Sequence, residues 1–419
     1  MEKLPLALLS IPLFINGLLN SYSQSPAPRT GEPVQVEKVL TVTKEELVNL
    51  WKKHRVSRFL VPVRYDVDIY ELIYTSLYPG GDVVRSSGLL FVPRMPASAK
   101  RPLLMFNHGT QIKHDRKVVL AAEQAICVGF ATDGYVVAMP DYFGIGKGER
   151  IHIYQHAESE AQANMDMIRA IRRLHDSLNL RLNDQLFITG YSQGGHAAMA
   201  THKFMEECYP EEFQVTASAP MSGAYDMTGV QSEVMYKDYP YPAYLPYLIS
   251  GYNQVYKLFS DLRKIFKHPY DTLVKHFYDG KTPFEEINRR LPTVPAQMIH
   301  DHLVREFRTN PNFSFLQVLR QNDVYDWAPK SPIMLCYCQA DEQVDYRNSL
   351  VAYKKMKANG SKYVYLTHAG KKFNHFKCAL YSVLYTKLFF DSFRKGSRYG
   401  SRGPILKRML LGISKLFAD

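Results

Sequence analysis

The chain contains a serine whose neighbours could make it a nucleophile. Residues 190–195 read Gly-Tyr-Ser-Gln-Gly-Gly, a G-x-S-x-G element centred on Ser192. An apolar run precedes it and a helix-forming run follows, which predicts a nucleophile elbow, a sharp turn between a strand and a helix. Glycines two residues before and after the serine let the backbone crowd there without a Cβ clash. Because the bare string arises by chance in about one chain in ten of this length, its context must decide.

A serine hydroxyl becomes a nucleophile when a histidine takes its proton and a carboxylate holds that histidine in the right tautomer. After a nucleophile elbow, the order along the chain is serine, acid, histidine. The apolar strand expected at 333–340 ends at Asp341, which we predict to be the acid. Asp345 is a rival that would cap the helix beginning near Tyr346, and Asp326 is a weaker rival within the preceding insertion.

Two histidines follow the last expected strand, at 362–366, and both are expected in the loop before a helix. His375 lies where this loop turns into an apolar helix, which leaves enough chain for its ring to reach Ser192 from a neighbouring strand. We therefore predict His375 as the base and keep His368, which is close enough to the strand to be structural, as the alternative. His108 precedes the serine and is predicted to order a loop.

The oxyanion formed in acyl transfer needs two hydrogen-bond donors. The first is expected to be the backbone N–H of Gln193, directly after the serine. The second is expected from the loop after the third strand, which reads Asn107-His108-Gly109-Thr110. By its position Thr110 is the predicted donor, and Gly109 would allow the close approach.

The elements around these residues alternate along the chain. Two extended runs, 64–76 and 83–92, flank the turn at 79–82 and predict an antiparallel hairpin. Strands are then expected at 103–106, 135–139, 185–189, 213–219, 333–338 and 363–366, and helices at 117–131, 158–178 and 193–207. This alternation predicts an α/β fold with a mostly parallel central sheet and helices on both faces. Ligands bind such a sheet at the carboxyl ends of its strands.

The predicted organisation has six parts. They are a signal peptide at 1–23, a linker and N-terminal segment at 24–60, the first part of the core at 61–225, a mainly helical cap at 226–327, the second part of the core at 328–396, and a basic amphipathic tail at 397–419. Residues 25–36 are rich in proline and polar residues, which is typical of a linker. The cap holds 18 aromatic residues in 102, with a cluster at 239–244, and is expected to roof the pocket.

The first residues have the pattern of an export signal. Lys3 precedes an apolar run at 4–19, and Ser21-Tyr22-Ser23 predicts a cut near Ser23 with delivery to a periplasm or to the outside. The run is shorter than the roughly 20 residues that a membrane span needs. The five cysteines are too sparse to suggest a disulfide framework and are expected to be buried thiols. CxxC and HExxH spacings are absent, so no metal site is expected.

The net charge of +12 is unevenly distributed. Residues 394–419 contain seven basic residues and one acidic residue, so this tail holds +6, half of the excess. Apolar residues recur there at helical spacing, with Lys407, Arg408 and Lys415 opposite them. A basic amphipathic helix of this kind can lie on an anionic membrane surface or pack on the body of the protein. With the excess concentrated in the tail, no nucleic-acid partner is expected.

Two longer motifs accompany the elbow, the Asn-His-Gly at 107–109, Asp341 and His375. Residues 140–146 read Pro-Asp-Tyr-Phe-Gly-Ile-Gly, and residues 156–163 read His-Ala-Glu-Ser-Glu-Ala-Gln-Ala. Between residues 61 and 393 the chain resembles the α/β-hydrolase superfamily, and more narrowly its secreted esterase and lipase branch. The resemblance implies hydrolysis of carboxylic esters through an acyl-enzyme, no cofactor, and a helical cap between the sixth and seventh core strands. The chain departs from this branch after the acid, where Asp345 replaces the usual proline.

These observations predict an exported serine esterase acting on a small-molecule or lipid-like ester. The first rival is a serine peptidase on the same fold, but the segment before residue 61 is too short for the large propeller that such peptidases often carry. The second rival is a non-catalytic binding protein, and the complete set of serine, acid and histidine weighs against it. Acyl length and leaving group depend on how the cap packs over the pocket.

Overall fold

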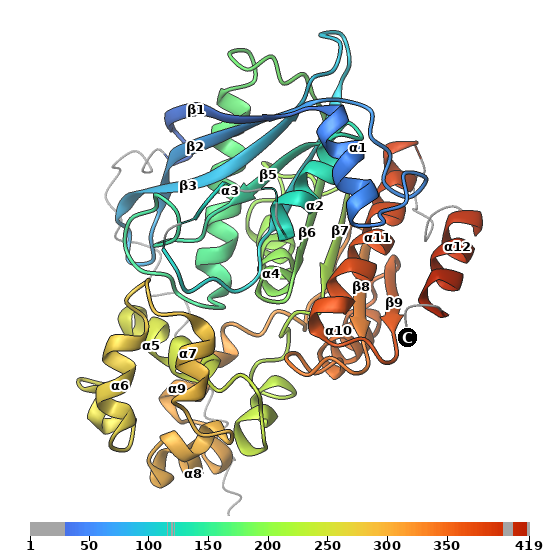
Figure 1. Cartoon of the computed structure of the whole chain (residues 1–419). Helices are drawn as coiled ribbons and strands as arrows, with labels where there is room; N and C mark the ends of the chain where they lie inside the picture. The colour runs from blue at the N-terminus through green and yellow to red at the C-terminus, as the bar shows by residue number, and fades with distance from the viewer. Residues whose placement is uncertain (1–29, 115, 119, 121, 397–404, 417–419) are drawn as a thin grey trace, which may run out of the picture.

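A computed structural model of the chain describes residues 30–396, apart from 115, 119 and 121, and residues 405–416. The predicted signal peptide at 1–23 lies outside the described residues, as do 397–404 and 417–419 of the predicted tail. Figure 1 shows a twisted sheet covered by helices, a helical part packed at one end of it, and a last helix at the edge of the molecule. The predicted α/β fold is confirmed.

Within the described residues the sheet has nine strands in the order β1-β2-β3-β5-β4-β6-β7-β8-β9. They are β1 (Pro33–Val42), β2 (Val67–Leu77), β3 (Val83–Pro93), β4 (Arg101–Asn107), β5 (Val136–Pro140), β6 (Leu182–Tyr191), β7 (Ala217–Met221), β8 (Ile333–Cys338) and β9 (Val364–Gly370). The pairs β1–β2, β2–β3 and β3–β5 are antiparallel, and the pairs from β5–β4 to β8–β9 are parallel. Strands β4, β5, β7 and β8 are buried along their whole length, because helices cover both of their faces.

Helices pack on both faces of the sheet (Figure 1). One face carries α1 (Lys44–Lys53), α2 (Ala122–Ala131) and α11 (His375–Arg394), and the other carries α3 (Ala157–Arg173), α4 (Gln193–Cys208) and α10 (Arg347–Ala358). Successive residues of β6 serve the two layers: Phe187 packs with Phe390 of α11, and Ile188 belongs to the cluster that includes Ile168 of α3. Successive side chains of a strand point to opposite faces of the sheet, so β6 packs against both helix layers. The end of β6 therefore lies at the centre of the core.

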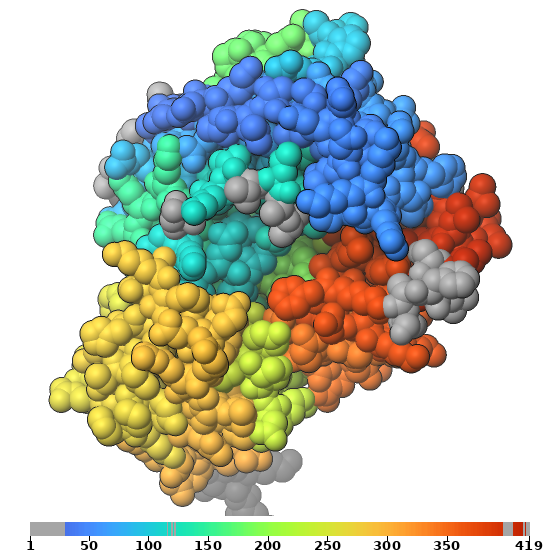
Figure 2. All heavy atoms as spheres, in the orientation of Figure 1, coloured from blue at the N-terminus to red at the C-terminus, as the bar shows by residue number. Residues whose placement is uncertain are grey.

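Between β7 and β8 the chain forms a helical part, which we call the cap. Its helices are η1 (Gln231–Tyr236), α5 (Tyr244–Tyr256), η2 (Leu262–Lys264), α6 (Tyr270–Phe277), α7 (Phe284–Arg289), η3 (Pro295–Met298), α8 (Asp301–Thr309) and α9 (Ser314–Arg320). The cap has its own apolar cluster, in which Tyr252, Phe266 and Phe307 are buried. Figure 2 shows the cap as a body packed against one end of the core. The aromatic residues of this segment thus form both a core and a surface toward the sheet.

Several boundaries differ from the prediction. β1 begins at Pro33, inside the segment expected to be a linker, because it pairs along β2 as an added edge strand. α2 begins at Ala122 rather than at 117. β9 extends to Gly370, so that His368 lies in a strand and not in the loop where it was expected. For β1 and β9 a neighbouring strand sets where the element starts or ends, and the local sequence pattern does not contain that partner.

The expectation that all five cysteines are thiols is wrong. Cys338, the last residue of β8, and Cys378, in the first turn of α11, form a disulfide across 40 residues of chain, while Cys127, Cys208 and Cys336 are free. The spacing of these residues carried no signal because α11 begins beside the end of β8 only in the folded chain. The bridge joins the two segments that carry the predicted acid and base.

Candidate active site

Ser192 stands in the turn between β6 and α4, as the elbow motif predicted. Its φ of 61° and ψ of −120° lie in a sparsely populated region, which a non-glycine residue occupies only where its surroundings hold it. The flanking glycines are required by close approach: a Cβ on Gly190 would overlap the carbonyl of Gly194, and a Cβ on Gly194 would overlap the carbonyl of Asn107. The turn therefore presents the serine on the side of the sheet that faces the cap, where it lines a pocket.

His375 and Asp341 form a buried pair. His375 is the first residue of α11, and Asp341 lies in the loop after β8. The His375 Nδ1 lies 2.8 Å from both carboxylate oxygens of Asp341. The backbone N–H groups of Gln343 and Val344 donate to Asp341 Oδ1 at 3.0 Å and fix the carboxylate. When Nδ1–H donates to Asp341, the other ring nitrogen, Nε2, is the one that can accept a proton.

The histidine is also fixed beside the elbow. The hydroxyl of Tyr191, the residue before the serine, donates to the His375 carbonyl oxygen at 2.6 Å, and the centroids of the two rings are 4.8 Å apart. The His375 N–H donates to Glu342 Oε2 at 2.9 Å. The structure thus brings the predicted base to the residue adjacent to Ser192, and it does so through both its side chain and its backbone.

The rival acids and the rival base lie elsewhere. Asp345 accepts from the backbone N–H of Arg347 at 2.9 Å and pairs with the guanidinium of the same residue at 2.6 Å. Asp326 forms an ion pair with Lys355 at 3.0 Å. His368 lies in β9, at the edge of the sheet. Of the candidates, Asp341 and His375 are the two that the fold brings together.

Both predicted oxyanion donors lie beside the serine. Gln193 is the first residue of α4, so its N–H has no partner within the helix and lies at the positive end of the helix dipole. In the loop after β4, the Gly109 N–H already donates to Glu123 Oε1 at 2.7 Å, and the next N–H belongs to Thr110. A Cβ placed on Gly109 would lie 3.9 Å from the Cβ of Ser192, which shows how closely this loop passes the elbow.

Glu123, on α2, supports this loop and was not expected from the sequence. Burial raises its pKa to about 7, and the hydrogen bond from the Gly109 N–H opposes the rise. The carboxyl group therefore changes between its neutral and charged forms near neutral pH while it anchors the residue before Thr110. No motif marks Glu123, because it is 14 residues from Gly109 and reaches that residue only through the packing of α2 on the sheet.

The side chain of Gln193 belongs to a buried polar network. Its Nε2 lies 2.8 Å from His152 Nε2 and 2.8 Å from Glu160 Oε1. The second oxygen of Glu160 lies 2.7 Å from His196 Nδ1, and His196 Nε2 lies 2.9 Å from the carbonyl oxygen of Asn322. Both nitrogens of His196 face acceptors, an arrangement that favours the doubly protonated ring. Burial alone would lower the pKa of His196, but the Glu160 carboxylate outweighs burial and the pKa is raised.

Two other buried histidines near the site are neutral. His108 Nδ1 lies 2.7 Å from the carbonyl oxygen of Gly109, and the Tyr142 hydroxyl donates to the carbonyl oxygen of His108 at 2.9 Å. Burial lowers the pKa of His108 and, to about 3, the pKa of His152. His108 is thus a fixed part of the loop before Thr110, as its interpretation as a loop-ordering residue required.

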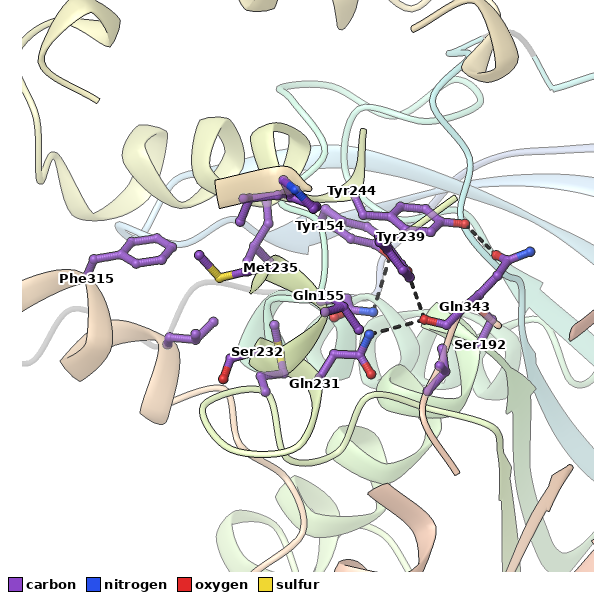
Figure 3. Close-up of a pocket in the computed structure, with 17 residues that line it drawn as sticks. Tyr154, Gln155, Ser192, Gln231, Ser232, Met235, Tyr239, Tyr244, Phe315 and Gln343 are labelled. Atoms are coloured by element: carbon purple, nitrogen blue, oxygen red, sulfur yellow. Dashed lines mark hydrogen bonds between the residues drawn. The ribbon is translucent and has the colours of Figure 1, made fainter. Parts of the chain in front are cut away.

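A pocket extends from Ser192 into the cap. Figure 3 shows Ser192 at one end of the lining and Phe315 at the other. The apolar part of the wall comes mainly from Met227, Met235, Leu245, Leu248, Phe315 and Leu319. The pocket therefore offers a mainly apolar space that begins at Ser192.

The acid loop and the cap meet at Gln343, two residues after Asp341. The Gln343 carbonyl oxygen accepts from the Tyr239 hydroxyl at 2.8 Å and from Gln231 Nε2 at 3.2 Å, and its Oε1 accepts from the Tyr244 hydroxyl at 2.9 Å (Figure 3). The cluster predicted to roof the pocket thus lies in its wall and is hydrogen-bonded to the acid loop. Gln343 and Glu342 were both missed from the sequence, although their place directly after Asp341 was a usable signal.

Taken together, these groups are a serine in an elbow turn, a histidine paired with a carboxylate, and two backbone amides near the serine, which are the kinds of group that acyl transfer requires. Among the described residues, no three His, Cys, Asp or Glu side chains are grouped as ligands of a metal ion would be.

Comparison with known proteins identifies the family to which the chain is similar. The model of the family described as secretory lipase matches residues 110–383. That segment includes the donor loop from Thr110, the elbow, the cap and the loops with Asp341 and His375. No curated protein matches the chain.

Solved structures match most of the chain. A hydrolase candidate from Legionella pneumophila shares 26% identity with a TM-score of 0.79 over 87% of this chain and 99% of that one. The rice cell wall degrading esterase LipA from Xanthomonas oryzae shares 26% identity with a TM-score of 0.77 over 88% and 100%. Lipase A from Candida antarctica in its closed state, at 16% identity and a TM-score of 0.64 over 90% and 84%, shares the fold.

Proposed function

Because the chain belongs to the secretory lipase family, we propose that it is an exported serine hydrolase that cleaves carboxylic esters through an acyl-enzyme. The observation that carries this proposal is the buried His375–Asp341 pair beside the elbow of Ser192, which lines an apolar pocket. An ester hydrolase needs this combination, because the nucleophile must be activated where the acyl group is bound.

In the first half of the proposed reaction, Ser192 Oγ attacks the ester carbonyl carbon while His375 Nε2 takes the hydroxyl proton. Asp341 accepts the Nδ1–H and stabilises the imidazolium that forms. The carbonyl oxygen becomes an oxyanion, held by the backbone N–H groups of Gln193 and Thr110. His375 then donates the same proton to the alkoxide, which leaves as the alcohol while the serine keeps the acyl group.

In the second half, water replaces the alcohol. His375 takes a proton from the water as its oxygen attacks the acyl carbon, and the oxyanion forms again at the same donors. Collapse of this intermediate breaks the bond to Ser192, which recovers its proton from His375, and the carboxylic acid leaves. Neither half requires a cofactor or a metal ion.

The pocket supports a small-molecule or lipid-like ester as the substrate. Its apolar wall in the cap suits an acyl chain, and the side chains of Tyr239 and Tyr244 beside Gln343 suit the more polar end near the acid loop. An acyl chain that enters the cap would bring its carbonyl to Ser192 at the opposite end of the lining.

Export is supported by the secretory lipase family and by the disulfide, since disulfides persist in oxidising compartments. We propose that the signal peptide at 1–23 is removed by a cut near Ser23, before the first described residue. Mass spectrometry of the exported protein should find its new N-terminus near residue 24. An N-terminus that still contains Lys3 would contradict the cleavage.

A labelling experiment tests the reaction. A fluorophosphonate probe should label the protein at Ser192, and p-nitrophenyl esters should be hydrolysed, whereas Ser192→Ala should abolish both. Ser232→Ala is the matched control, because Ser232 lines the same pocket without belonging to the proposed machinery, and it should keep both.

The rival functions give different results in the same experiment. Labelling of Ser192 with turnover of a peptide amide but of no ester would favour a serine peptidase. Absence of labelling in a protein with an unchanged melting temperature would favour a binding protein. Either result would overturn the proposed ester hydrolysis.

A further inference from the structure

The last helix of the described chain, α12 (Ile405–Leu416), has its apolar side turned to solvent. Five apolar side chains are between 43% and 73% exposed, namely Ile405, Leu406, Met409, Leu410 and Ile413. At 100° per residue, these five positions fall within one arc of roughly 140° on the helix. A helix that packed by its apolar stripe would bury this arc, so the stripe does not serve the fold.

The opposite side of α12 contacts the protein through Lys407, Leu411 and Lys415, which are spaced four residues apart. Leu411 is fully buried in the apolar cluster that includes α11. Lys407 Nζ lies 4.9 Å from the ring centroid of Phe59, and Lys415 Nζ lies 5.0 Å from that of Tyr385. These contacts orient α12 with two lysines inward and the apolar arc outward, at the edge of the molecule beside α11 (Figure 1).

Positive charge is concentrated in the segment that contains α12. The segment from residue 394 onward carries a net charge of +6. On α12 itself, Arg408 is half-buried, and Lys395 is exposed at the end of α11. At the other end of α12, Lys415 and Lys371 both act on His368, and burial together with these two lysines lowers the pKa of that histidine.

We propose that α12 is a peripheral anchor that docks the protein on an anionic lipid surface. The apolar side chains match such a surface because they can enter the acyl boundary, and the net positive charge of the segment attracts negative headgroups. None of the helices in the described ranges is long and apolar enough to cross a bilayer, so α12 would lie in the plane of the interface. The proposal concerns location and does not depend on ester hydrolysis.

A second copy of the chain could also cover the apolar arc, and charge argues against it. Pairing two such helices face to face would bring together two segments that each carry +6, and like charges across an interface cost affinity. An anionic lipid surface satisfies the apolar arc and the charge at once. Dimerisation is therefore an outcome that the test must separate from lipid binding.

Vesicle flotation tests the anchor on the chain without residues 1–23, whose own apolar run would bind lipid. The protein should float with vesicles that contain phosphatidylglycerol, float less with pure phosphatidylcholine, and be partly released by salt. The combined substitution Leu406→Asn and Ile413→Asn should lower the partition coefficient roughly tenfold or more, because both side chains enter the interface.

Val34→Asn combined with Val83→Asn is the matched control, because these side chains are 53% and 46% exposed on strands far from α12 in the chain. This control should bind vesicles as the wild type does, and unchanged melting temperatures should show that both variants fold. Failure of the wild type to float with phosphatidylglycerol vesicles would overturn the anchor. Equal flotation of the α12 variant, or a dimer in sedimentation that this variant abolishes, would do so too. A protein that floats but hydrolyses no ester would contradict the proposed reaction alone.

Discussion

Asp341 binds His375 with both carboxylate oxygens at 2.8 Å, and two backbone N–H groups bind Asp341 in turn. A carboxylate fixed on both sides can keep the imidazole in one tautomer and one orientation, which is its role beside a serine nucleophile. Asp345, four residues further along, pairs with Arg347 instead. Asp345 stands where the related branch usually has a proline, and Asp341 is nevertheless in contact with His375.

Asp341→Asn should lower kcat on p-nitrophenyl esters by roughly 10³- to 10⁴-fold, because an amide favours the wrong tautomer of His375. Asp345→Asn is the matched control and should change kcat by no more than about threefold, because its ion pair is near the surface. Steady-state kinetics, with melting temperatures to verify folding, check both variants. A greater loss in Asp345→Asn would reverse the assignment of the acid.

Glu123 should make stability depend on pH. Its pKa is about 7 in the folded protein, against an ordinary value of 4.5. Between these values the folded protein retains a proton that the unfolded chain has released, so the free energy of unfolding should fall as the pH rises from about 4.5 to about 7. Glu123→Gln should flatten this part of the curve, as measured by urea unfolding across the range. Glu45→Gln, at an exposed site on α1, should leave the curve unchanged, and parallel curves for wild type and Glu123→Gln would refute the shifted pKa.

At the scale of elements, β8 and α11 carry the acid and the base at adjoining ends. The disulfide joins the last residue of β8 to the first turn of α11. Asp341 follows Cys338 by three residues, and Cys378 follows His375 by three. The bridge therefore limits how far the two segments can separate, in addition to stabilising the fold.

Cys338→Ser combined with Cys378→Ser should lower the free energy of unfolding by roughly 2–4 kcal/mol, the usual effect of removing a disulfide that closes a loop of this length. It should also lower kcat at a temperature where the variant remains folded, because the acid and base segments lose their covalent link. Urea unfolding and kinetics measure the two effects. Cys208→Ser, at an exposed free cysteine, should change neither. If kcat were unchanged in the double variant, the disulfide would contribute to stability and not to the position of the acid and base.

The cap helices determine the length of the pocket. Met235, from η1, and Phe315, from α9, line its far part. Met235→Trp should shorten the space and lower kcat/KM for long-chain p-nitrophenyl esters while leaving the acetate ester little changed. Leu316→Trp, next to Phe315 but outside this lining, is the control and should keep the chain-length profile. An unchanged profile in Met235→Trp would place the acyl chain elsewhere.

At the scale of the whole molecule, the two ends of the cap are tied to each other and to the core. Asp323, after α9, accepts from the backbone N–H groups of Met227 at 2.7 Å and Thr228 at 3.0 Å. Asn322 Oδ1 accepts from the Ala157 N–H at the start of α3 at 2.7 Å. Through its carbonyl, Asn322 also meets the network that fixes the side chain after the serine. The position of the cap over the site thus depends on a few buried bonds.

Asn322→Ala should leave the Ala157 N–H unpaired in the interior and lower the free energy of unfolding by roughly 1–3 kcal/mol. Because the cap wall would be less firmly placed, KM for long-chain esters should rise more than KM for the acetate. Urea unfolding and kinetics across chain lengths check this. Asn312→Ala, at an exposed site in the cap, should have neither effect. If KM changed equally for all esters, the position of the cap would not determine how the enzyme binds acyl chains of different length.

Much of the fold was predictable because its signals are local. The elbow at Ser192 follows from glycines within two residues, and the buried strands follow from short apolar runs. The order of Ser192, Asp341 and His375 along the chain was sufficient to propose their roles. The sequence pattern also predicted that α12 has an apolar side, but not that this side faces solvent.

The sequence by itself thus determined the type of fold and the chemistry that its residues could perform, because strand period, turn geometry and side-chain chemistry are properties of neighbouring residues. The tertiary structure alone decided which groups meet. It paired Cys338 with Cys378, brought Glu123 to Gly109, docked Gln343 on the cap and turned the apolar side of α12 outward. These contacts join residues far apart in the chain, and their distances follow from how the helices pack on the sheet, which no local pattern specifies.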